Sequence, residues 1–262
     1  MKERADKMLV TQGLAGSRHQ AQALIMAGDV YTGELRVEKP GQLLDAGKML
    51  RLKQRLPYVS RGGLKLEAAL QRFGIQVQGR IGLDLGASTG GFTDCLLQNG
   101  AARVYAVDVD PRQLDWKLMN DPRVTAIKKN ARYLSAGDLP GPVDLAVMDL
   151  SFISVLKVLP ALSGLIGGGK VIALIKPQFE VGKGRVGKKG VIRDPSLHIE
   201  VLTRVTAEAD LMGFGLGGAL RSPVSGQKGN REFLVLWARG PSSLTPLQRD
   251  SQIKEAVWDE TS

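Results

Sequence analysis

The sequence contains a single cysteine, Cys95, and no run of eighteen apolar residues. One cysteine excludes a disulfide framework and a multi-cysteine metal site within the chain, so no bound metal is expected. The lack of a long apolar run argues against a membrane-spanning helix. The first residues, Met1-Lys2-Glu3-Arg4, lead into mixed polarity rather than into a secretory signal. We therefore expect a cytoplasmic protein.

Acidic residues are in short supply relative to basic ones. Lysine and arginine total 36 against 26 aspartates and glutamates, which gives a net charge of +10 and a pI near 9.8. Such an excess favours a polyanionic partner, and nucleic acid before membrane, because no basic amphipathic anchor helix is evident. A soluble basic protein without such a partner is the alternative.

The pattern of apolar residues predicts four parts: a small domain at 1–54, a linker at 55–60, a large domain at 61–240 and a polar tail at 241–262 that is loose at its end. In the small domain, "RADKMLVTQGL" and "GSRHQAQALIMAGDV" have helical spacing, with Ser17 placed to cap the second helix and Gly28 to end it. Short β-like pieces follow, so this domain is predicted to be α+β.

The large domain alternates apolar strands with helical segments, beginning with a helix from Lys65. "IGLDL", "RVYAVDV", "RVTAI", "VDLAVMDL" and "KVIALIK" are the clearest strands, and this alternation predicts a parallel, doubly wound α/β sheet. Only "VSGQKGN" separates the last two strand-like pieces, and so short a connection implies an antiparallel pair at the sheet edge. A mostly parallel sheet with an antiparallel last strand is the Rossmann-like arrangement of methyltransferases.

The stretch "GLDLGASTGGFTDCL" has three interpretations. The first is the G-x-S-x-G turn of a serine hydrolase, which needs an acid and then a histidine after Ser88. Only His198 follows, in a segment predicted to be the exposed side of an amphipathic helix. The second is a dinucleotide loop, for which Asp108 is placed as the ribose-binding acid.

The third interpretation is a site for S-adenosylmethionine. Ser88 stands where a dinucleotide loop has its second glycine, and Asp84 just before the turn makes the site smaller and more acidic. An acid near a helix N-terminus suits a cationic sulfonium and an amino group better than a diphosphate. Asp84 can alternatively be a simple helix cap. The residues favour the methyl donor.

The methyl acceptor is predicted from the polar residues at the strand ends. "VMDLSFIS" contains neither the Pro-Pro-aromatic segment of amino-nitrogen methyltransferases nor a nucleophilic cysteine, and Cys95 is expected to be a buried apolar residue. A lysine at the end of a buried strand is expensive unless it is paired, and Asp149 is the natural partner of Lys176. We expect Lys176 to accept the proton of a ribose 2'-hydroxyl while Lys65, Asp149 and Glu232 hold it in register. A solvated surface lysine is the alternative for Lys65.

Several long motifs resemble the TlyA, or haemolysin-A-type, family. They include "YVSRGGLKLEAAL", "DLGASTGGFTDCLLQNGA", "QLDWKLMNDPRV", "MDLSFIS", "ALIKPQFE" and "VGKKGVIRDP". The match runs from about residue 4 to 238. The resemblance implies an αL RNA-binding domain of the S4 type, an FtsJ-like domain, and 2'-O-methylation of cytidine in ribosomal RNA of one or both subunits. In the linker, Pro57-Tyr58 stands where some members place a tryptophan.

The resemblance also assigns residues. It implies a Lys-Asp-Lys-Glu tetrad at Lys65, Asp149, Lys176 and Glu232. It implies donor contacts at Asp84, Gly86, Ala87, Ser88, Thr89, Gly90, Gly91, Phe92, Asp108 and Val109, with Asn130, Ala131 and Arg132 at the adenine.

Two basic groups are candidates for RNA contacts. One lies in the small domain: Arg4, Lys7, Arg18 and His19. The other is the glycine-rich run 182–190, interpreted as a mobile loop that closes over RNA: Lys183, Arg185, Lys188 and Lys189. Solvated surface charge is the alternative for each of them.

Three competing functions remain open at this point. Pseudouridine synthases often carry the same first domain, and "GLDLGASTGG" faintly resembles their Leu-Asp segment, although the residues that should follow are displaced by one. A membrane-damaging haemolysin would need spanning segments that the sequence lacks. A pure binding module is disfavoured because all four tetrad residue types are present.

Overall fold

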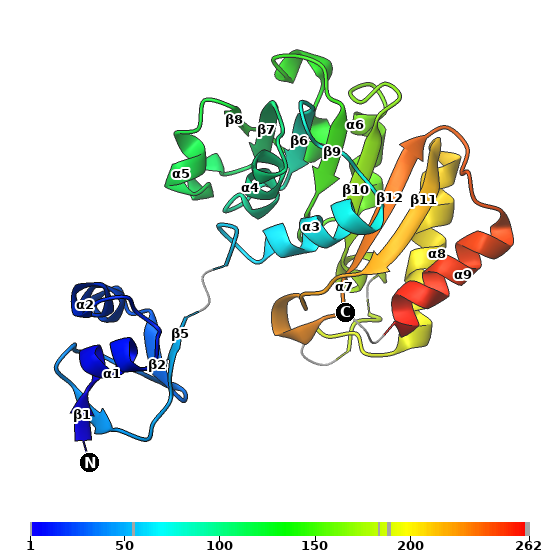
Figure 1. The fold of residues 1–262 in the computed structure, drawn as a ribbon. Coiled ribbons are helices and arrows are strands. Elements are labelled where there is room, and N and C mark those ends of the chain that lie inside the picture. The colour runs from blue at the N-terminus through cyan, green and yellow to red at the C-terminus, as the bar shows by residue number, and fades with distance from the viewer. Residues whose placement is uncertain (1, 54–55, 183, 188–189, 260–262) are drawn as a thin grey trace. The chain divides into compact units, whose positions relative to one another are not determined.

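The computed structural model describes residues 2–53, 56–182, 184–187 and 190–259. The chain divides into two compact units, Met1–Leu56 and Pro57–Ser262, which are drawn in Figure 1 and described separately. The predicted linker at 55–60 thus contributes its last residues to the second unit.

The first unit is a small α+β domain, as predicted. Its elements are β1 (Lys2–Arg4), α1 (Ala5–Thr11), α2 (Arg18–Met26), β2 (Val30–Thr32), β3 (Leu35–Arg36), β4 (Leu43–Asp45) and β5 (Leu50–Leu52). Ser17 caps α2 by accepting a hydrogen bond from the Gln20 amide at 3.2 Å, and Gly28 ends it with a φ of +78°. The β1–β4 pair was not predicted, because each strand has only three residues.

The second unit is built on a seven-stranded sheet of order β11-β12-β10-β9-β6-β7-β8. The strands are β6 (Ile81–Leu85), β7 (Arg103–Asp108), β8 (Val124–Lys128), β9 (Leu145–Met148), β10 (Lys170–Ile175), β11 (Phe214–Arg221) and β12 (Phe233–Arg239). The pairs from β10 to β8 are parallel, and β12 is antiparallel to both β10 and β11. This confirms the predicted mostly parallel sheet with an antiparallel last strand.

Helices cover both faces of this sheet. One core cluster joins alternate strand residues to α3 (Gly62–Arg72), α4 (Gly91–Gln98) and α5 (Trp116–Met119). The other joins the opposite strand faces to α6 (Leu159–Leu162), α8 (Pro195–Leu211) and α9 (Pro246–Trp258). The remaining helical elements are α7 (Pro177–Glu180), η1 (Pro111–Gln113), η2 (Ala131–Tyr133), η3 (Ala136–Asp138), η4 (Val155–Lys157) and η5 (Gln227–Gly229).

Two predictions about local structure need correction, and one helix was not predicted. The polar tail contains α9, which packs against β11 and α8 and buries Ile253, Ala256 and Val257; the end of the tail that was predicted to be loose, 260–262, lies outside the described residues. His198 is fully buried rather than exposed, since it lies on the apolar stripe of α8. The helix predicted from Lys65 begins at Gly62. No helix within the described ranges is long and apolar enough to cross a bilayer.

The sheet brings distant segments to one edge. Strands β6, β9 and β10 run parallel, so the residues after their carboxyl ends lie at the same edge of the sheet. Because β12 runs the other way, its first residue, Phe233, pairs with Ile175 at the end of β10. Glu232 therefore lies at the same edge as Lys176.

Candidate active site

A cavity of about 310 Å³ opens at this edge of the sheet. Its walls come from the N-terminal end of α3, the loop after β6, the segments after β9 and β10, and the loop before β12. The lining residues are Ser60, Arg61, Gly62, Lys65, Gly86, Ala87, Ser88, Thr89, Gly91, Phe92, Asp149, Ser151, Phe152, Lys176, Gln178, Phe179, Gly226 and Glu232.

All four residues of the predicted tetrad line the cavity, and they form two lysine–carboxylate pairs. Lys65 Nζ lies 2.6 Å from Glu232 Oε2, across 167 residues of sequence. Lys176 Nζ lies 2.6 Å from Asp149 Oδ1 and donates to Ser151 Oγ at 3.0 Å. The solvated alternative for Lys65 is wrong, because this residue is only 8% exposed.

The pairing explains how two lysines can be held in a closed space. A buried ammonium group is destabilising unless a carboxylate lies beside it. Lys65 of α3 is paired with Glu232 before β12, whereas Lys176 and Asp149 follow the neighbouring strands β10 and β9, so the fold sets the positions of the two amines. The arrangement can orient a polar substrate between two cations and two acceptors, and one amine can exchange a proton with it.

The glycine loop after β6 needs its first glycine for two reasons. Gly86 has a φ of +83°, and a Cβ at this position would come within 2.7 Å of the Asp149 carbonyl oxygen. Ser88 also has a positive φ of 49°, and its amide donates to Asp108 Oδ2 at 2.9 Å. Asp108 Oδ1 accepts from the Asp110 amide at 2.9 Å. The carboxylate at the end of β7 therefore holds the loop in shape and retains further lone pairs.

Asp84 lies beneath this loop and is fully buried. Its Oδ2 accepts a hydrogen bond from the Thr93 hydroxyl at 2.7 Å, while Oδ1 has no partner among the described residues. Burial raises the pKa of Asp84 to about 7, against the opposing effect of the Thr93 hydrogen bond. The N-cap of α4 is Gly90, so Asp84 is not a simple cap, although it ties the first turn of α4 to β6.

The remaining predicted donor residues do not line this cavity. Gly90 is covered by Leu114 and Leu118 on the side where another residue would carry its Cβ. Val109 follows β7 and is exposed. Residues 130–132 follow β8, the neighbour of β7, so both segments end at the same edge of the sheet. Asn130 Oδ1 accepts from the Arg132 amide at 3.0 Å, Ala131 is buried, and the Arg132 guanidinium lies over the Tyr133 ring.

Several lining residues were missed by the sequence reasoning. They are Ser60, Arg61, Gly62, Ser151, Phe152, Gln178, Phe179 and Gly226. Phe152 is the most informative, because it is 87% exposed and has a φ of +65°. Its ring packs against that of Phe179, with centroids 5.1 Å apart. The signal was present in "SFIS" and "KPQFE", the polar and aromatic segments that come after β9 and β10.

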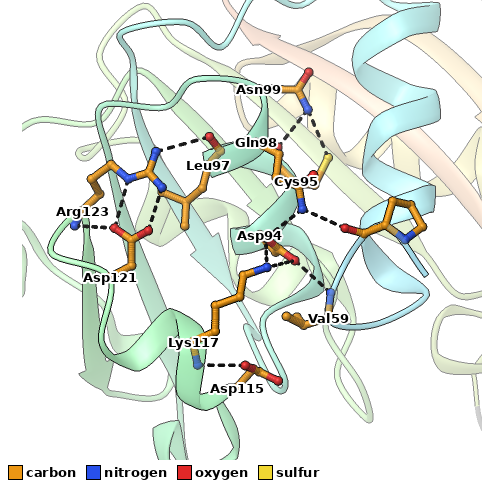
Figure 2. Close-up of polar contacts among 11 residues, drawn as sticks. Val59, Asp94, Cys95, Leu97, Gln98, Asn99, Asp115, Lys117, Asp121 and Arg123 are labelled. Atoms are coloured by element: carbon orange, nitrogen blue, oxygen red, sulfur yellow. Dashed lines mark hydrogen bonds and ion pairs between the residues drawn. The ribbon is translucent and has the colours of Figure 1, made fainter. Parts of the chain in front are cut away.

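The glycine loop is supported from outside by a buried carboxylate on α4, as Figure 2 shows. Asp94 is 1% exposed and accepts from the Val59 amide at 2.9 Å and from Gln98 Nε2 at 3.0 Å. Lys117 of α5 lies 3.1 Å from Asp94 Oδ1, and the Asp115 amide donates to the Thr89 carbonyl at 3.1 Å. Segment 57–59, α4 and α5 are thus tied together around the loop.

Two other chemistries are disfavoured by the geometry. His198 does not line the cavity with Ser88; its Nε2 lies 3.3 Å from the Ile192 carbonyl oxygen, and its ring meets Phe233 edge-on. Cys95 is fully buried in α4, and burial raises the pKa of its thiol to about 12. Neither residue can serve as catalyst in this cavity. The described residues contain no group of three or more side chains suited to a metal ion.

Four of the five predicted RNA contacts that the structure describes already have a carboxylate partner. Arg4 and Arg18 both bind the buried Asp6, Lys7 lies 3.1 Å from Glu3, and His19 is exposed. In the basic run 182–190, Arg185 forms two hydrogen bonds with Glu200. Lys183, Lys188 and Lys189 lie outside the described residues.

The sequence also matches known families. The model of the FtsJ-like methyltransferase family matches residues 58–239. The chain belongs to the FtsJ-like methyltransferase family. A second model, that of the S4 domain, matches residues 3–50. This FtsJ-like protein therefore combines a methyltransferase domain with an S4 domain, as the motifs indicated.

Individual relatives of this FtsJ-like protein cover most of its length. It is 47% identical over 240 residues to "16S/23S rRNA (cytidine-2'-O)-methyltransferase TlyA" of Mycobacterium tuberculosis, which covers 90% of this chain and 89% of that one. It is 40% identical to "Hemolysin A" of Brachyspira hyodysenteriae, over 88% and 98% of the two chains. A solved structure from Streptococcus thermophilus is 46% identical, with a TM-score of 0.74 over 97% and 95% of the chains.

Proposed function

We propose that this enzyme transfers a methyl group from S-adenosylmethionine to the ribose 2'-hydroxyl of a cytidine in ribosomal RNA. The observation that carries the proposal is the presence of two lysine–carboxylate pairs in one cavity with a glycine loop. The relative from Mycobacterium tuberculosis has this activity in its name. The S4 match and the net charge of +10 support RNA as the substrate.

The donor fits the loop after β6. Gly86 leaves room for close backbone approach, and Asp84 Oδ1 is a buried acceptor without a partner in the part of the chain that the structure describes. Such an oxygen suits the cationic amino group of the donor, since an unpaired buried acceptor is costly. We assign the donor to Asp84, Gly86, Ala87, Ser88, Thr89, Gly90, Gly91, Phe92, Asp108, Val109, Asn130, Ala131 and Arg132. When bound, the donor supplies a methyl group on a sulfonium, which the ribose oxygen receives in line.

The acceptor ribose lies, in this proposal, between the two lysine–carboxylate pairs. Lys176 accepts the proton of the 2'-hydroxyl as the ribose oxygen attacks the methyl group, and Asp149, 2.6 Å from Lys176 Nζ, stabilises the ammonium that results. Lys65 and Glu232 hold the ribose in register, because their own pairing fixes both side chains. Ser151 keeps the Lys176 amine in place through its hydroxyl.

The RNA is bound beyond the cavity by collective phosphate contacts. We assign these to Arg4, Lys7, Arg18 and His19 of the S4 domain and to Lys183, Arg185, Lys188 and Lys189 of the basic run. Phe152 adds an exposed ring at the cavity wall, on which an unstacked base can lie. Arg4, Arg18 and Arg185 must exchange or share their carboxylate partners with phosphate.

The decisive experiment maps 2'-O-methyl groups in both ribosomal RNAs from cells with and without the gene. We expect at least one cytidine to lose its methyl group without the gene, to regain it with the wild-type protein, and to stay unmodified with Lys176→Ala. Both subunits need mapping, because a relative from Campylobacter jejuni, 33% identical over 75% of this chain, is named for 23S RNA alone. Identical maps in the presence and absence of the gene would refute the proposal. Lysis of liposomes by the purified protein without donor would favour a membrane activity.

A further inference from the structure

Two segments face each other along one wall of the cavity, and they are joined by further contacts besides the Lys176–Asp149 ion pair of the tetrad. Residues 149–155 follow β9, and residues 176–180 follow β10. Beyond the Lys176–Asp149 pair, Lys176 donates to Ser151 Oγ at 3.0 Å. Further along, the rings of Phe152 and Phe179 meet, and the Val155 amide donates to Glu180 Oε1 at 2.9 Å. The two segments are therefore joined at successive points.

Glu180 is the last of these contacts and does not line the cavity. Its side chain is 5% exposed, and burial raises the pKa of its carboxyl group. A buried carboxyl is an unfavourable choice where only packing is needed, since an apolar side chain of similar size lacks this desolvation penalty. What the carboxyl adds is an acceptor for the Val155 amide, a buried donor that has no other acceptor within the described ranges.

Phe152 lies between the two polar anchors in a strained conformation. Its φ of +65° is unusual for a bulky residue, and such a strained conformation persists only where the surrounding structure imposes it. The chain is held one residue before it, at Ser151, and three residues after it, at Val155. With both ends held, the Phe152 ring is directed outward, where it is 87% exposed at the cavity wall.

We propose that Glu180 is a positioning residue for RNA binding: by holding the Val155 amide, it keeps Phe152 presented to the target nucleotide. This inference depends on the proposed function, because it takes RNA as the substrate. Glu180 itself touches neither the donor loop nor the tetrad in the described contacts. Its loss should therefore impair the RNA side of the reaction and leave the donor side intact.

The test compares Glu180→Ala with Glu180→Gln in the full-length protein. The glutamine retains an acceptor for Val155 and has the same shape, whereas the alanine leaves the amide without a partner. With ribosomal subunits from cells lacking the gene as substrate, we expect Glu180→Ala to raise the KM for RNA about fivefold or more. The Kd for S-adenosylmethionine, measured by calorimetry, should stay within twofold. Glu180→Gln should restore the wild-type KM.

A double-mutant cycle with Phe152→Ala separates positioning from general damage. If Glu180 acts through Phe152, Glu180→Ala should change the KM for RNA by less than twofold when Phe152 is already alanine. The control is Glu208→Ala, which removes another partner of Arg204, the residue whose guanidinium binds the Glu180 carbonyl. We expect wild-type kinetics from Glu208→Ala.

Other outcomes overturn the inference. Additive effects in the cycle, a parallel loss of donor affinity, or failure of Glu180→Gln to restore KM would each show a merely structural role. If Glu180→Ala does not fold, Val155→Pro removes the donor instead, at the first position of η4, where proline is tolerated; an unchanged KM for this variant would contradict the inference. Failure of the proposed function is distinguishable, because the wild-type protein would then methylate no RNA.

Discussion

Lys176 is the side chain on which the proposed chemistry depends most directly. It lies at the end of β10, paired with Asp149 and bonded to Ser151. We expect Lys176→Ala to lower kcat by about 10²- to 10⁴-fold, the usual contribution of a general base, and to leave donor binding within twofold. Single-turnover methylation and calorimetry measure the two quantities. Lys170→Ala, at the exposed start of the same strand, is the matched control, and full turnover by Lys176→Ala would refute the assignment.

Asp84 gives a prediction for the pH dependence of stability. The pKa of this carboxyl is raised to about 7 by burial, so the folded protein binds a proton that the unfolded chain releases above about pH 4. The free energy of unfolding should therefore fall as the pH rises from about 4 to about 7, by up to about 1.4 kcal/mol per pH unit, and then level off.

Asp84→Asn removes this titration. Chemical denaturation of the donor-free protein at pH 5 and pH 8 should show that the variant gains stability relative to wild type as the pH rises. A wild-type-to-variant difference that is the same at both pH values would show that Asp84 ionises normally. The asparagine should also weaken donor binding, because it lacks the negative charge that we assign to the amino group of the donor.

Helix α4 is fixed to its neighbouring elements by the contacts of one buried carboxylate. Asp94 ties α4 to segment 57–59 and to Lys117 of α5, around the loop that we assign to the donor. Asp94→Ala would leave the Val59 amide without its acceptor and release Lys117. We expect a several-fold rise in the Kd for S-adenosylmethionine, with kcat at saturating donor within twofold, because the tetrad does not contact Asp94.

Asp121→Ala provides a control for this variant. Asp121 binds Arg123 beyond the other end of α5, in a surface pair that does not include Asp94 and that contacts α4 through the Leu97 carbonyl (Figure 2). Its loss should leave donor affinity unchanged, as measured by calorimetry. If both variants weakened donor binding equally, any surface change near α4 and α5 would have this effect, and a specific role for Asp94 would be refuted.

Helices and strands were predictable where a regular apolar pattern dominates the local sequence. The parallel strands are continuous apolar runs, because both of their faces are buried. The pattern was misread in two places. In α8, His198 stands four residues before Leu202, on the buried stripe of the helix. The helical spacing therefore indicated that His198 is buried. In α9, a polar sequence conceals the apolar spacing Ile253-Ala256-Val257 and a capping box at Thr245 and Gln248.

The excess of positive charge over the whole molecule predicts how RNA binding responds to salt. Each phosphate contact releases counterions, so binding that depends on phosphates weakens steeply as salt increases. We expect the affinity for ribosomal RNA to fall at least about tenfold between 50 and 200 mM salt, as measured by filter binding. A plot of the logarithm of the binding constant against the logarithm of the salt concentration gives a negative slope. Lys7→Gln should reduce the size of this slope by about one, whereas Lys254→Gln on α9 should leave it unchanged. Retention that hardly changes with salt would contradict the phosphate contacts.

Local sequence was enough to predict the parallel strands, the glycine loop and the polar residues at the strand ends, Asp149, Lys176 and Glu232, whereas Lys65 was assigned through the resemblance to the family. Each of these features depends on a short stretch of the chain, because a run of apolar residues indicates a buried strand and the spacing of the glycines indicates the turn. The reversed direction of the last strand was predicted from the short connection, but its place was not: β12 returns beside β10, between β10 and β11 (Figure 1). That return places Glu232 against Lys65. The contacts between segments 149–155 and 176–180 likewise place the exposed Phe152 in the wall of the cavity that Lys176 lines. Such contacts join residues far apart in sequence, so they exist only once the chain has packed.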